Sequence, residues 1–442
     1  MATNSVGADA RPRPFYGWWI VIGSFLIMAT CYAVFVNTGS LFQRYVVADL
    51  GITVSQYNLG VTIGSLTGII GSLLIGPLID RCSARIVTTG VVAVAGLVLF
   101  LYSTMDALWQ LYVYRFIAGF IIVAGTRLLV SVLITNWFKK KQGLALAIAL
   151  AGSGLGGALL SPVITALIGS SGWRFAYMVL GAMCVVLTLP IVLPFFASKP
   201  SDKGLEPYGG ADYVEIKADT TEEATAEEHL LEGIGWKQLR RSAPFWVMVL
   251  GFVAMGLVNG CILTNQVSNM TSITVNGTEI VTGGHSPEWA SVVLSANLVT
   301  VVFAKLVTGW LYDRFGIKAA TLVGTAACVI ACIGLCFPAT DIGSYVGGIA
   351  FGFGTCMGTI APPVVVSRAF GKQDLGKVNG IVVGFQLLGG AVGTVLSGVV
   401  FDAFLSFAPV WIFCIVSSMV MGACILGSTA WAHRRRMKEL AA

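Results

Sequence analysis

Long apolar runs separated by short polar loops are the dominant pattern along the chain. Most runs hold about 20 apolar residues, which is the length that an α-helix needs to cross the hydrocarbon core of a bilayer. The pattern predicts twelve membrane-spanning helices in two sets of six. The predicted spans cover residues 16–36, 57–79, 86–105, 108–134, 144–168, 174–196, 244–266, 289–311, 318–338, 343–366, 379–402 and 407–431.

One long polar stretch separates the two sets of spans. It contains an acidic segment from Thr220 to Glu232, followed by the cations Lys237, Arg240 and Arg241. We expect it to be a solvated linker. The predicted domains are therefore an N-terminal six-helix bundle (1–196), a cytoplasmic linker (197–243) and a C-terminal six-helix bundle (244–442).

The composition agrees with a membrane protein. Hydrophobic residues make up 56% of the 442 residues and charged residues only 11%, whereas soluble proteins carry roughly 25% charged residues. The 53 glycines also fit, because small residues let membrane helices approach closely. Gly152, Gly154 and Gly157 have the spacing of a dinucleotide fingerprint, but that motif needs a preceding strand. Here it lies within an apolar run, so we expect helix packing through Gly152 and Gly156.

The positions of the basic residues predict the orientation. The loops on the side of the two termini and the linker hold 22 of the 27 Lys and Arg, and the other side holds only Arg44 and Arg174. Cytoplasmic loops are the ones rich in Lys and Arg. We therefore expect a multi-pass protein of the cell membrane with both termini cytoplasmic, surrounded by membrane lipid. The net charge of +6 is spread over short loop clusters, which argues against a nucleic-acid partner.

A loop motif occurs twice, 233 residues apart, after the second and the eighth span. Both copies read G-x-x-x-D-R-x-[SG]-x-[RK], which indicates two related halves. We expect the glycine to permit close helix approach. The acid and the bases are expected to pair with each other and with helix ends, so that they hold one conformation closed. The motif residues are Gly76, Asp80, Arg81 and Arg85 in the first copy and Gly309, Asp313, Arg314 and Lys318 in the second.

Over essentially its whole length the chain resembles transporters of the major facilitator superfamily. The resemblance rests on the repeated loop motif and on the sequence Arg115-Phe-Ile-Ala-Gly119 in the fourth span. It implies an all-α membrane fold in which twelve helices form two pseudo-symmetric bundles around a central cavity that opens to each side in turn. Arg115 is expected to serve structure or gating. Four segments are similar to the oxalate/formate antiporter and monocarboxylate porter branch: Tyr16 to Trp19, Trp137-Phe138, Gly172 to Arg174, and Pro244 to Trp246.

Two cations lie deep within predicted spans, and no acid lies in the interior of any span. At a rise of about 1.5 Å per residue, Arg127 lies about 15 Å and Lys305 about 12 Å from the cytoplasmic boundary, near the middle of the bilayer. Charges buried there are costly and need a counter-charge. A small organic anion would supply it, because Arg can hold a carboxylate with two hydrogen bonds and Lys adds a second positive charge. The alternatives are that Lys305 extends toward the interface and that Arg127 bonds helix-end carbonyls.

The resemblance also assigns candidate substrate residues. Lys305 occupies the position where oxalate and monocarboxylate carriers place a substrate-binding Arg, and Gln386 the position of a substrate-binding Lys in the oxalate carrier. Val301 stands where proton-coupled monocarboxylate carriers have an Asp, which favours exchange over proton symport. Tyr32 in the first span is a further candidate. The expected substrate-binding residues are Arg127, Lys305, Gln386 and Tyr32.

The sequence does not indicate metal binding, cofactor binding or enzymatic activity. Cys328, Cys332 and Cys336 share a helix face, but no His or acid accompanies them, so we expect packing rather than a metal site. No Walker motif is present, and we expect neither a cofactor nor enzymatic activity. The predicted function is secondary active transport of mono- or dicarboxylates such as oxalate, formate, lactate or pyruvate, by a monomeric antiporter with a counter-substrate or proton as partner. The alternatives are a proton-coupled exporter or importer of another solute class, and a non-transporting membrane sensor.

Overall fold

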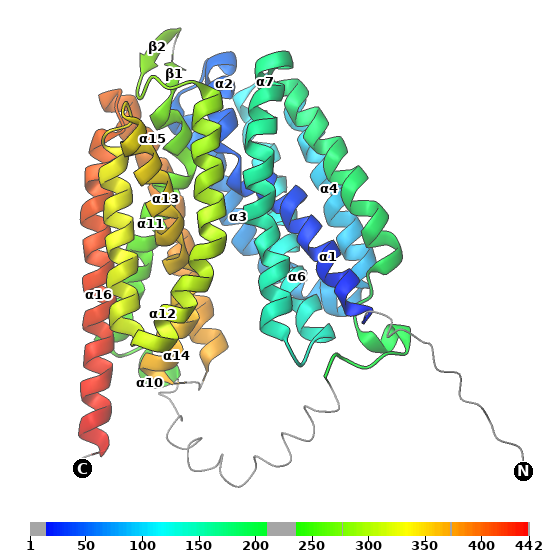
Figure 1. Ribbon diagram of the computed structural model, residues 1–442, viewed down its shortest axis with the longest axis vertical. Helices are drawn as coiled ribbons and strands as arrows, with labels where there is room; N and C mark the ends of the chain where they lie inside the picture. The colour runs from blue at the N-terminus through cyan, green and yellow to red at the C-terminus, as the bar shows by residue number, and fades with distance from the viewer. Residues whose placement is uncertain (1–14, 210–235, 276, 372–373, 441–442) are drawn as a thin grey trace, which may run out of the picture.

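The computed structural model describes residues 15–209, 236–275, 277–371 and 374–440, and these are overwhelmingly helical (Figure 1). The predicted all-α fold is confirmed. Two short helical turns lie near the ends of the linker, at Pro200–Lys203 and at Trp236–Leu239 (α10). The helices before the linker are α1 (Gly17–Ile27), η1 (Met28–Asn37), α2 (Ser40–Leu50), α3 (Val54–Arg81), α4 (Ala84–Ser103), α5 (Leu108–Ile117), η2 (Ala118–Val123), α6 (Ala124–Trp137) and α7 (Gln142–Phe195). Those after it are α11 (Ala243–Met270), α12 (Pro287–Leu335), α13 (Asp341–Thr359), α14 (Ala361–Phe370), α15 (Leu375–Phe404) and α16 (Ala408–Leu440).

The two longest helices, α7 and α12, each contain a glycine at which the chain turns back (Figure 1). Gly172 has φ 83° and Gly316 has φ 77°, values that a residue with a Cβ rarely adopts. Both glycines fall between two predicted spans. Among the described residues eight helices are long and apolar enough to cross a membrane, or nine if α13 and α14, bent by 44°, count as one span. The count of twelve spans stays a prediction.

The helices before and after the linker form two bundles that meet at one end and diverge toward the other (Figure 1). A two-stranded antiparallel hairpin of β1 (Ser272–Val275) and β2 (Thr278–Val281) lies at the end where they meet. We call this the hairpin end, and the opposite end, where α1 begins and α16 ends, the terminal end. The hairpin was not predicted from the apolar pattern, although the pair Asn276-Gly277 is a typical signal for one.

The apolar core shows how the bundles are joined. At the hairpin end one cluster of buried side chains draws on both bundles and includes Phe42 and Ile164 of the first with Cys261 and Leu298 of the second. Toward the terminal end the core divides into two separate clusters, one in each bundle. Among the described residues, the bundles therefore share a core only at the hairpin end.

Glycines bring several helices into backbone contact. A Cβ at Gly152 would collide with the carbonyl oxygen of Phe25, and one at Gly156 with the backbone of Ala29. The predicted role of these two glycines, close helix packing, is confirmed.

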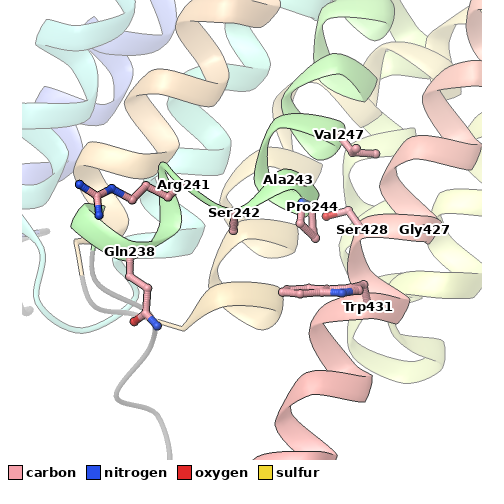
Figure 2. A pocket seen from close by; sticks show the side chains of 9 residues that line it. All are labelled: Gln238, Arg241, Ser242, Ala243, Pro244, Val247, Gly427, Ser428 and Trp431. Atoms are coloured by element: carbon pink, nitrogen blue, oxygen red, sulfur yellow. The ribbon is translucent and has the colours of Figure 1, made fainter.

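A pocket of about 670 Å³ lies at the terminal end of the second bundle, between the start of α11 and the later part of α16 (Figure 2). None of the predicted substrate residues lines it.

Candidate functional site

The structure brings Arg127 of the first bundle and Lys305 of the second into electrostatic range of each other. Arg127 lies on α6 with an exposed side chain, and Lys305 lies half-buried on α12. They are close enough that the charge of Arg127 acts on the Lys305 ammonium. Within the described residues neither forms an ion pair with a carboxylate, whereas Arg174 and Arg368 each do. The result is a positively charged site shared between the two bundles.

Lys305 points away from the apolar outer face of its helix. Phe303, Leu306 and Val307 are exposed and form one apolar stripe on α12. At about 100° per residue, Lys305 lies on the opposite side of the helix. The neighbouring group on the next helix is Cys356 of α13. Its thiol donates to the carbonyl of Gly352 at 3.5 Å.

Two side-chain amides, Gln386 of α15 and Asn259 of α11, lie against α13 close to Cys356. Gln386 on α15 is 9% exposed, and its Nε2 donates to the carbonyl of Gly358 at 2.9 Å. A Cβ at Gly358 would lie 2.6 Å from Gln386 Nε2 and 2.9 Å from Asn259 Nδ2, so the two amides meet over this glycine. Gln386 Oε1 and Asn259 Oδ1 are buried and have no hydrogen-bond partner within the part of the chain that the structure describes. They can accept hydrogen bonds from a bound molecule.

Tyr32 lies in the π-helical segment η1 and packs, half-buried, on the apolar cluster that contains Leu129 and Val130 of α6. None of its described contacts places it against Lys305, and its role in binding stays a prediction. A second π-helical segment, η2, precedes Arg127 by a few residues. Segments of this kind are rare and often occur at functional sites. Hydrophobic periodicity gave no sign of either one.

Arg115 has a different environment, within the first bundle. It is 8% exposed, and its Nη2 donates to the hydroxyl of Tyr57 at 2.9 Å. Its guanidinium carbon lies 5.5 Å from the ring centroids of both Tyr57 and Tyr102. Tyr57 in turn donates to the carbonyl of Gly39 at 3.1 Å. These contacts fit a structural role for Arg115 rather than contact with substrate.

Buried polar side chains join the two bundles at the hairpin end, and we call this set the polar lock. Gln43 donates to Asn265 at 3.0 Å and accepts from Ser268 at 2.6 Å, which ties α2 to α11. Asn58 on α3 donates to the carbonyl of Thr394 on α15 at 3.0 Å. The four side chains Gln43, Asn58, Asn265 and Ser268 are all buried.

Asp402 extends the polar lock at its rim. Its carboxylate, on α15 of the second bundle, accepts hydrogen bonds from the backbone N–H of Val54 at 3.2 Å and of Ser55 at 3.0 Å. These residues begin α3 of the first bundle, so the second bundle supplies the acid that stabilises the positive end of α3. This contact was not predicted, because its two partners are 348 positions apart in the sequence.

Comparison with known proteins identifies the architecture. The sequence model of the Major Facilitator Superfamily matches residues 20–272 and 261–440. The chain belongs to the major facilitator superfamily. It is therefore a multi-pass membrane transporter of small molecules, not an enzyme.

Several proteins share sequence or fold with this superfamily member. Human monocarboxylate transporter 12 is 24% identical over 472 residues, covering 99% of this chain and 85% of that protein. The MFS-type transporter pynF of Aspergillus niger is 26% identical over 414 residues, covering 88% and 89%. An inward-facing bacterial homologue of the human lysosomal transporter Spinster matches with a TM-score of 0.63 at 14% identity, over 97% of this chain and 99% of that one. The nucleoside transporter NupG matches with a TM-score of 0.66 at 13% identity, over 93% and 98%. At these identities the two solved structures establish the fold alone.

The second copy of the superfamily's loop motif pairs differently from what the sequence suggested. Asp313 pairs with Arg368 on α14, at 2.8 Å, rather than with Arg314 or Lys318. Arg368 also donates to the carbonyl of Tyr312 at 2.6 Å. The partner was missed because local spacing favoured the bases of the motif itself. Arg314 lies over the ring of Phe315, and Lys318 is exposed.

The glycine of this second copy also differs from expectation. No atom lies within 4 Å of the position that a Cβ would occupy at Gly309, so the predicted close helix approach is not made there in this conformation. In the first copy, Arg85 Nε donates to the carbonyl of Phe196 at 3.3 Å. The side chains of Gly76, Asp80 and Arg81 lie outside the described residues.

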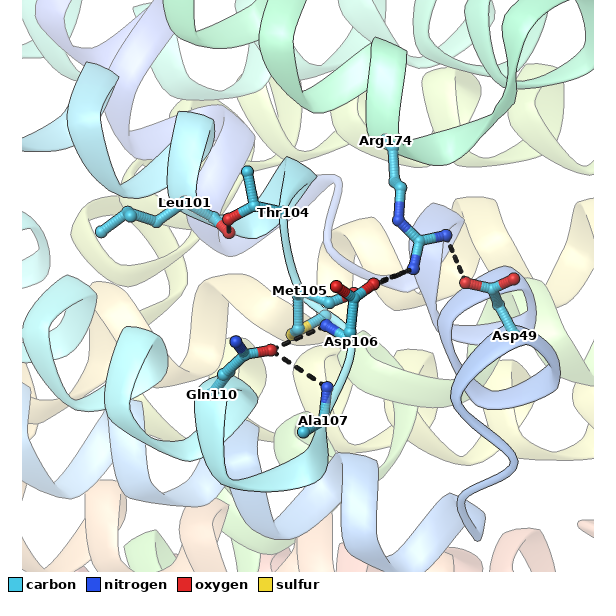
Figure 3. Close-up of polar contacts among 8 residues, drawn as sticks. All are labelled: Asp49, Leu101, Thr104, Met105, Asp106, Ala107, Gln110 and Arg174. Carbon is cyan, nitrogen blue, oxygen red and sulfur yellow. Dashed lines mark hydrogen bonds and ion pairs between the residues drawn. The ribbon is translucent and has the colours of Figure 1, made fainter.

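The remaining described cation–acid cluster stabilises the hairpin end of the first bundle (Figure 3). Arg174 bonds Asp49, Asp106 at 2.9 Å and the carbonyl of Met105 at 3.0 Å. All of these partners belong to the first bundle. The cluster fixes loops and does not bridge to the second bundle.

Proposed function

We propose that this protein is a secondary active transporter of small mono- or dicarboxylates, such as oxalate, formate, lactate or pyruvate, working by exchange. The observation that carries the proposal is that Arg127 and Lys305, on different bundles, lie within electrostatic range of each other, with no carboxylate paired to either among the described residues. Two like charges in a region of low dielectric repel each other, and each is costly to desolvate. A carboxylate between them relieves both effects and bridges the bundles at the same time.

The same geometry supports alternating access by exchange. In this conformation the bundles share a core and the polar lock at the hairpin end, so the site is closed on that side. Closing the terminal end would bring the two cations closer in a drier environment. Without an anion this movement is opposed by their repulsion, so the empty carrier reorients slowly. With an anion bound it becomes favourable, and transport proceeds as one anion exchanged for another.

Further support comes from sequence. Relatives that carry the name monocarboxylate transporter 12 cover nearly the whole chain at low identity, and the chain resembles the oxalate/formate antiporter branch in four short segments. Val301 stands where proton-coupled carriers have an Asp, which favours exchange. We place the terminal end in the cytoplasm of a cell-membrane protein, with bundles 1–196 and 244–442 joined by the linker 197–243 and acting as a monomer.

Counterflow in proteoliposomes tests the proposal. Vesicles loaded with unlabelled pyruvate, lactate, formate or oxalate should accumulate the labelled anion transiently, and empty vesicles should not. Arg127→Ala and Lys305→Ala should each abolish this accumulation, while Lys305→Arg should retain part of it. Normal counterflow in both alanine variants would refute the site.

Two other measurements address the alternative functions. Thermal stabilisation of the purified protein by organic cations, but not by carboxylates, would indicate another solute class. Absence of counterflow with every solute that stabilises the protein would indicate a sensor.

A further inference from the structure

The pocket at the terminal end of the second bundle is separate from the transport site and has the chemistry of an anion-binding site on one side. Arg241 lines it, and Lys237 and Arg240 are exposed in the same turn of chain. Figure 2 shows Arg241 and Gln238 on one side of the pocket and Trp431 on the other. The basic residues place positive charge at the mouth of the pocket.

The first turn of α11 adds backbone donors to this charge. Ser242 is the N-cap of the 28-residue helix α11 and makes no side-chain capping hydrogen bond, and both Ser242 and Ala243 line the pocket. The N-terminus of a helix carries partial positive charge and N–H groups that point outward, which favours bound phosphate. Arg241 thus borders the pocket beside the helix N-terminus, and in Figure 2 its guanidinium extends away from Ser428 and Trp431.

A buried hydroxyl points to a missing partner. Ser428 on α16 lines the pocket and is only 2% exposed. Its Oγ is buried without a hydrogen-bond partner among the described residues. Buried hydroxyls in folded proteins are nearly always hydrogen-bonded. A ligand oxygen in the pocket would supply the bond.

The rest of the pocket is apolar and continues toward the lipid-facing surface. Val247 and Trp431 line it and are 40% and 39% exposed, and Leu250, one turn further along α11, is 53% exposed. Tryptophan is enriched at the boundary between membrane and water. A free phosphate ion would use only the polar side, whereas a lipid uses both.

We propose that this pocket binds the headgroup of an anionic phospholipid. Arg241, once its side chain rotates toward the pocket, and the free N–H groups in the first turn of α11 hold the phosphate. Ser428 donates to a phosphate or glycerol oxygen, and an acyl chain follows Val247 and Leu250. The bound lipid ties the start of α11 to α16. Anionic lipids are attracted to basic segments next to a membrane surface, which adds to the selectivity for a charged headgroup.

Native mass spectrometry of the detergent-purified protein, titrated with phosphatidylglycerol, tests the proposal. We expect one tightly retained lipid, and Arg241→Gln should weaken its binding about tenfold, as expected when a charged hydrogen bond is lost. Arg240→Gln is the matched control, because it removes the same charge at the next position from a side chain that does not line the pocket. It should leave the binding of the lipid nearly unchanged.

A second variant fills the pocket instead of removing charge. Gly427 lines the pocket, and no atom lies within 4 Å of its would-be Cβ, so Gly427→Leu can be accommodated and should exclude the lipid. Thermal unfolding without added lipid checks that each variant is folded. If one variant is not, the other still tests the site.

Three results would overturn the proposal. Equal loss of lipid in Arg240→Gln and Arg241→Gln would indicate general charge attraction. Equal retention of phosphatidylcholine would indicate an apolar groove without headgroup recognition. Displacement of the lipid by millimolar inorganic phosphate would indicate a site for the free ion.

Discussion

Arg115 and Arg127 lie twelve residues apart on the same predicted span, yet the groups that surround the two side chains are very different. Arg115 is buried among tyrosines, with a hydroxyl at 2.9 Å and two ring faces beside it. Arg127 is exposed and directed into electrostatic range of Lys305 in the other bundle. A cation within a membrane span is therefore not by itself evidence of a ligand. The groups that contact the cation indicate whether it stabilises the fold or is available to bind a substrate.

The segment η2 lies between the two arginines and contributes to this difference. Twelve residues of uninterrupted α-helix would rotate one side chain about 120° from the other. A π-helical turn holds more residues than an α-helical turn and changes that angle. The helix can therefore direct Arg115 into its own bundle and Arg127 toward the second.

The largest expected effect comes from exchanging the arginines for a neutral amide one at a time. Arg127→Gln should lower the rate of carboxylate counterflow by about 100-fold, the order of effect seen when one member of a desolvated charge contact is removed. Arg115→Gln should reduce thermal stability but leave the substrate affinity of the folded fraction unchanged. Measuring both quantities on both variants tests the comparison, and the reverse outcome would contradict it.

A new acid should give the Lys305 ammonium a partner within its own bundle, as Tyr57 does for Arg115. Val301 lies one helical turn before Lys305, so Val301→Asp places a carboxylate within reach of the ammonium. We expect uptake at neutral pH to fall about tenfold, the equivalent of a modest charge pair, and to recover as the pH is lowered and the new acid is protonated. Val301→Asn is the neutral control of the same size. Unchanged uptake in Val301→Asp would show that the ammonium does not bind substrate.

Removing the hydroxyl of Tyr57 should weaken the contacts that hold Arg115 without changing substrate binding. Tyr57→Phe removes the hydrogen bond to the guanidinium and also the one to Gly39, at an expected cost of about 2 kcal/mol in the free energy of unfolding. Chemical denaturation measures that cost. Tyr16→Phe, which also removes one hydroxyl hydrogen bond to backbone at 3.0 Å, should cost less, because no charge is involved. An altered substrate affinity in Tyr57→Phe would place Arg115 in the site.

The smallest effect concerns the balance between conformations. Asp402→Asn weakens the contact with the start of α3 and should favour opening of the hairpin end by about 1 kcal/mol, the value of a capping interaction. Spin-label distances across the hairpin end would then show a larger open population. Asp341→Asn, which changes an acid at the same end but within one bundle, serves as control.

The sequence was sufficient for the fold, whereas the substrate site that it suggests stays a prediction. Apolar runs of bilayer length predicted the helices, and the glycines at 152 and 156 predicted a close helix contact. The absence of acids from the spans pointed to Arg127 and Lys305 as candidate substrate-binding residues, because an unpaired charge within a membrane span is costly.

What could not be predicted depends on contacts between distant segments. The polar lock joins residues more than 200 positions apart, such as Gln43 and Asn265, and no local pattern marks them as partners. The Asp313 to Arg368 pair was missed for a similar reason, since a nearer base offered an equally plausible partner. The π-helical segments change helix direction without changing composition, so periodicity carries no trace of them.

The backbone contact between α11 and α15 limits how this protein can adapt. A side chain at Gly256 would strike the carbonyl oxygen of Gln386, and one at Gly260 would strike that of Gly390. The two helices thus touch without side chains between them, and neither can absorb a substitution there by repacking. Selection for a new substrate would leave these glycines untouched and act on the side chains that project from this fixed pair into the site, such as Asn259 and Gln386.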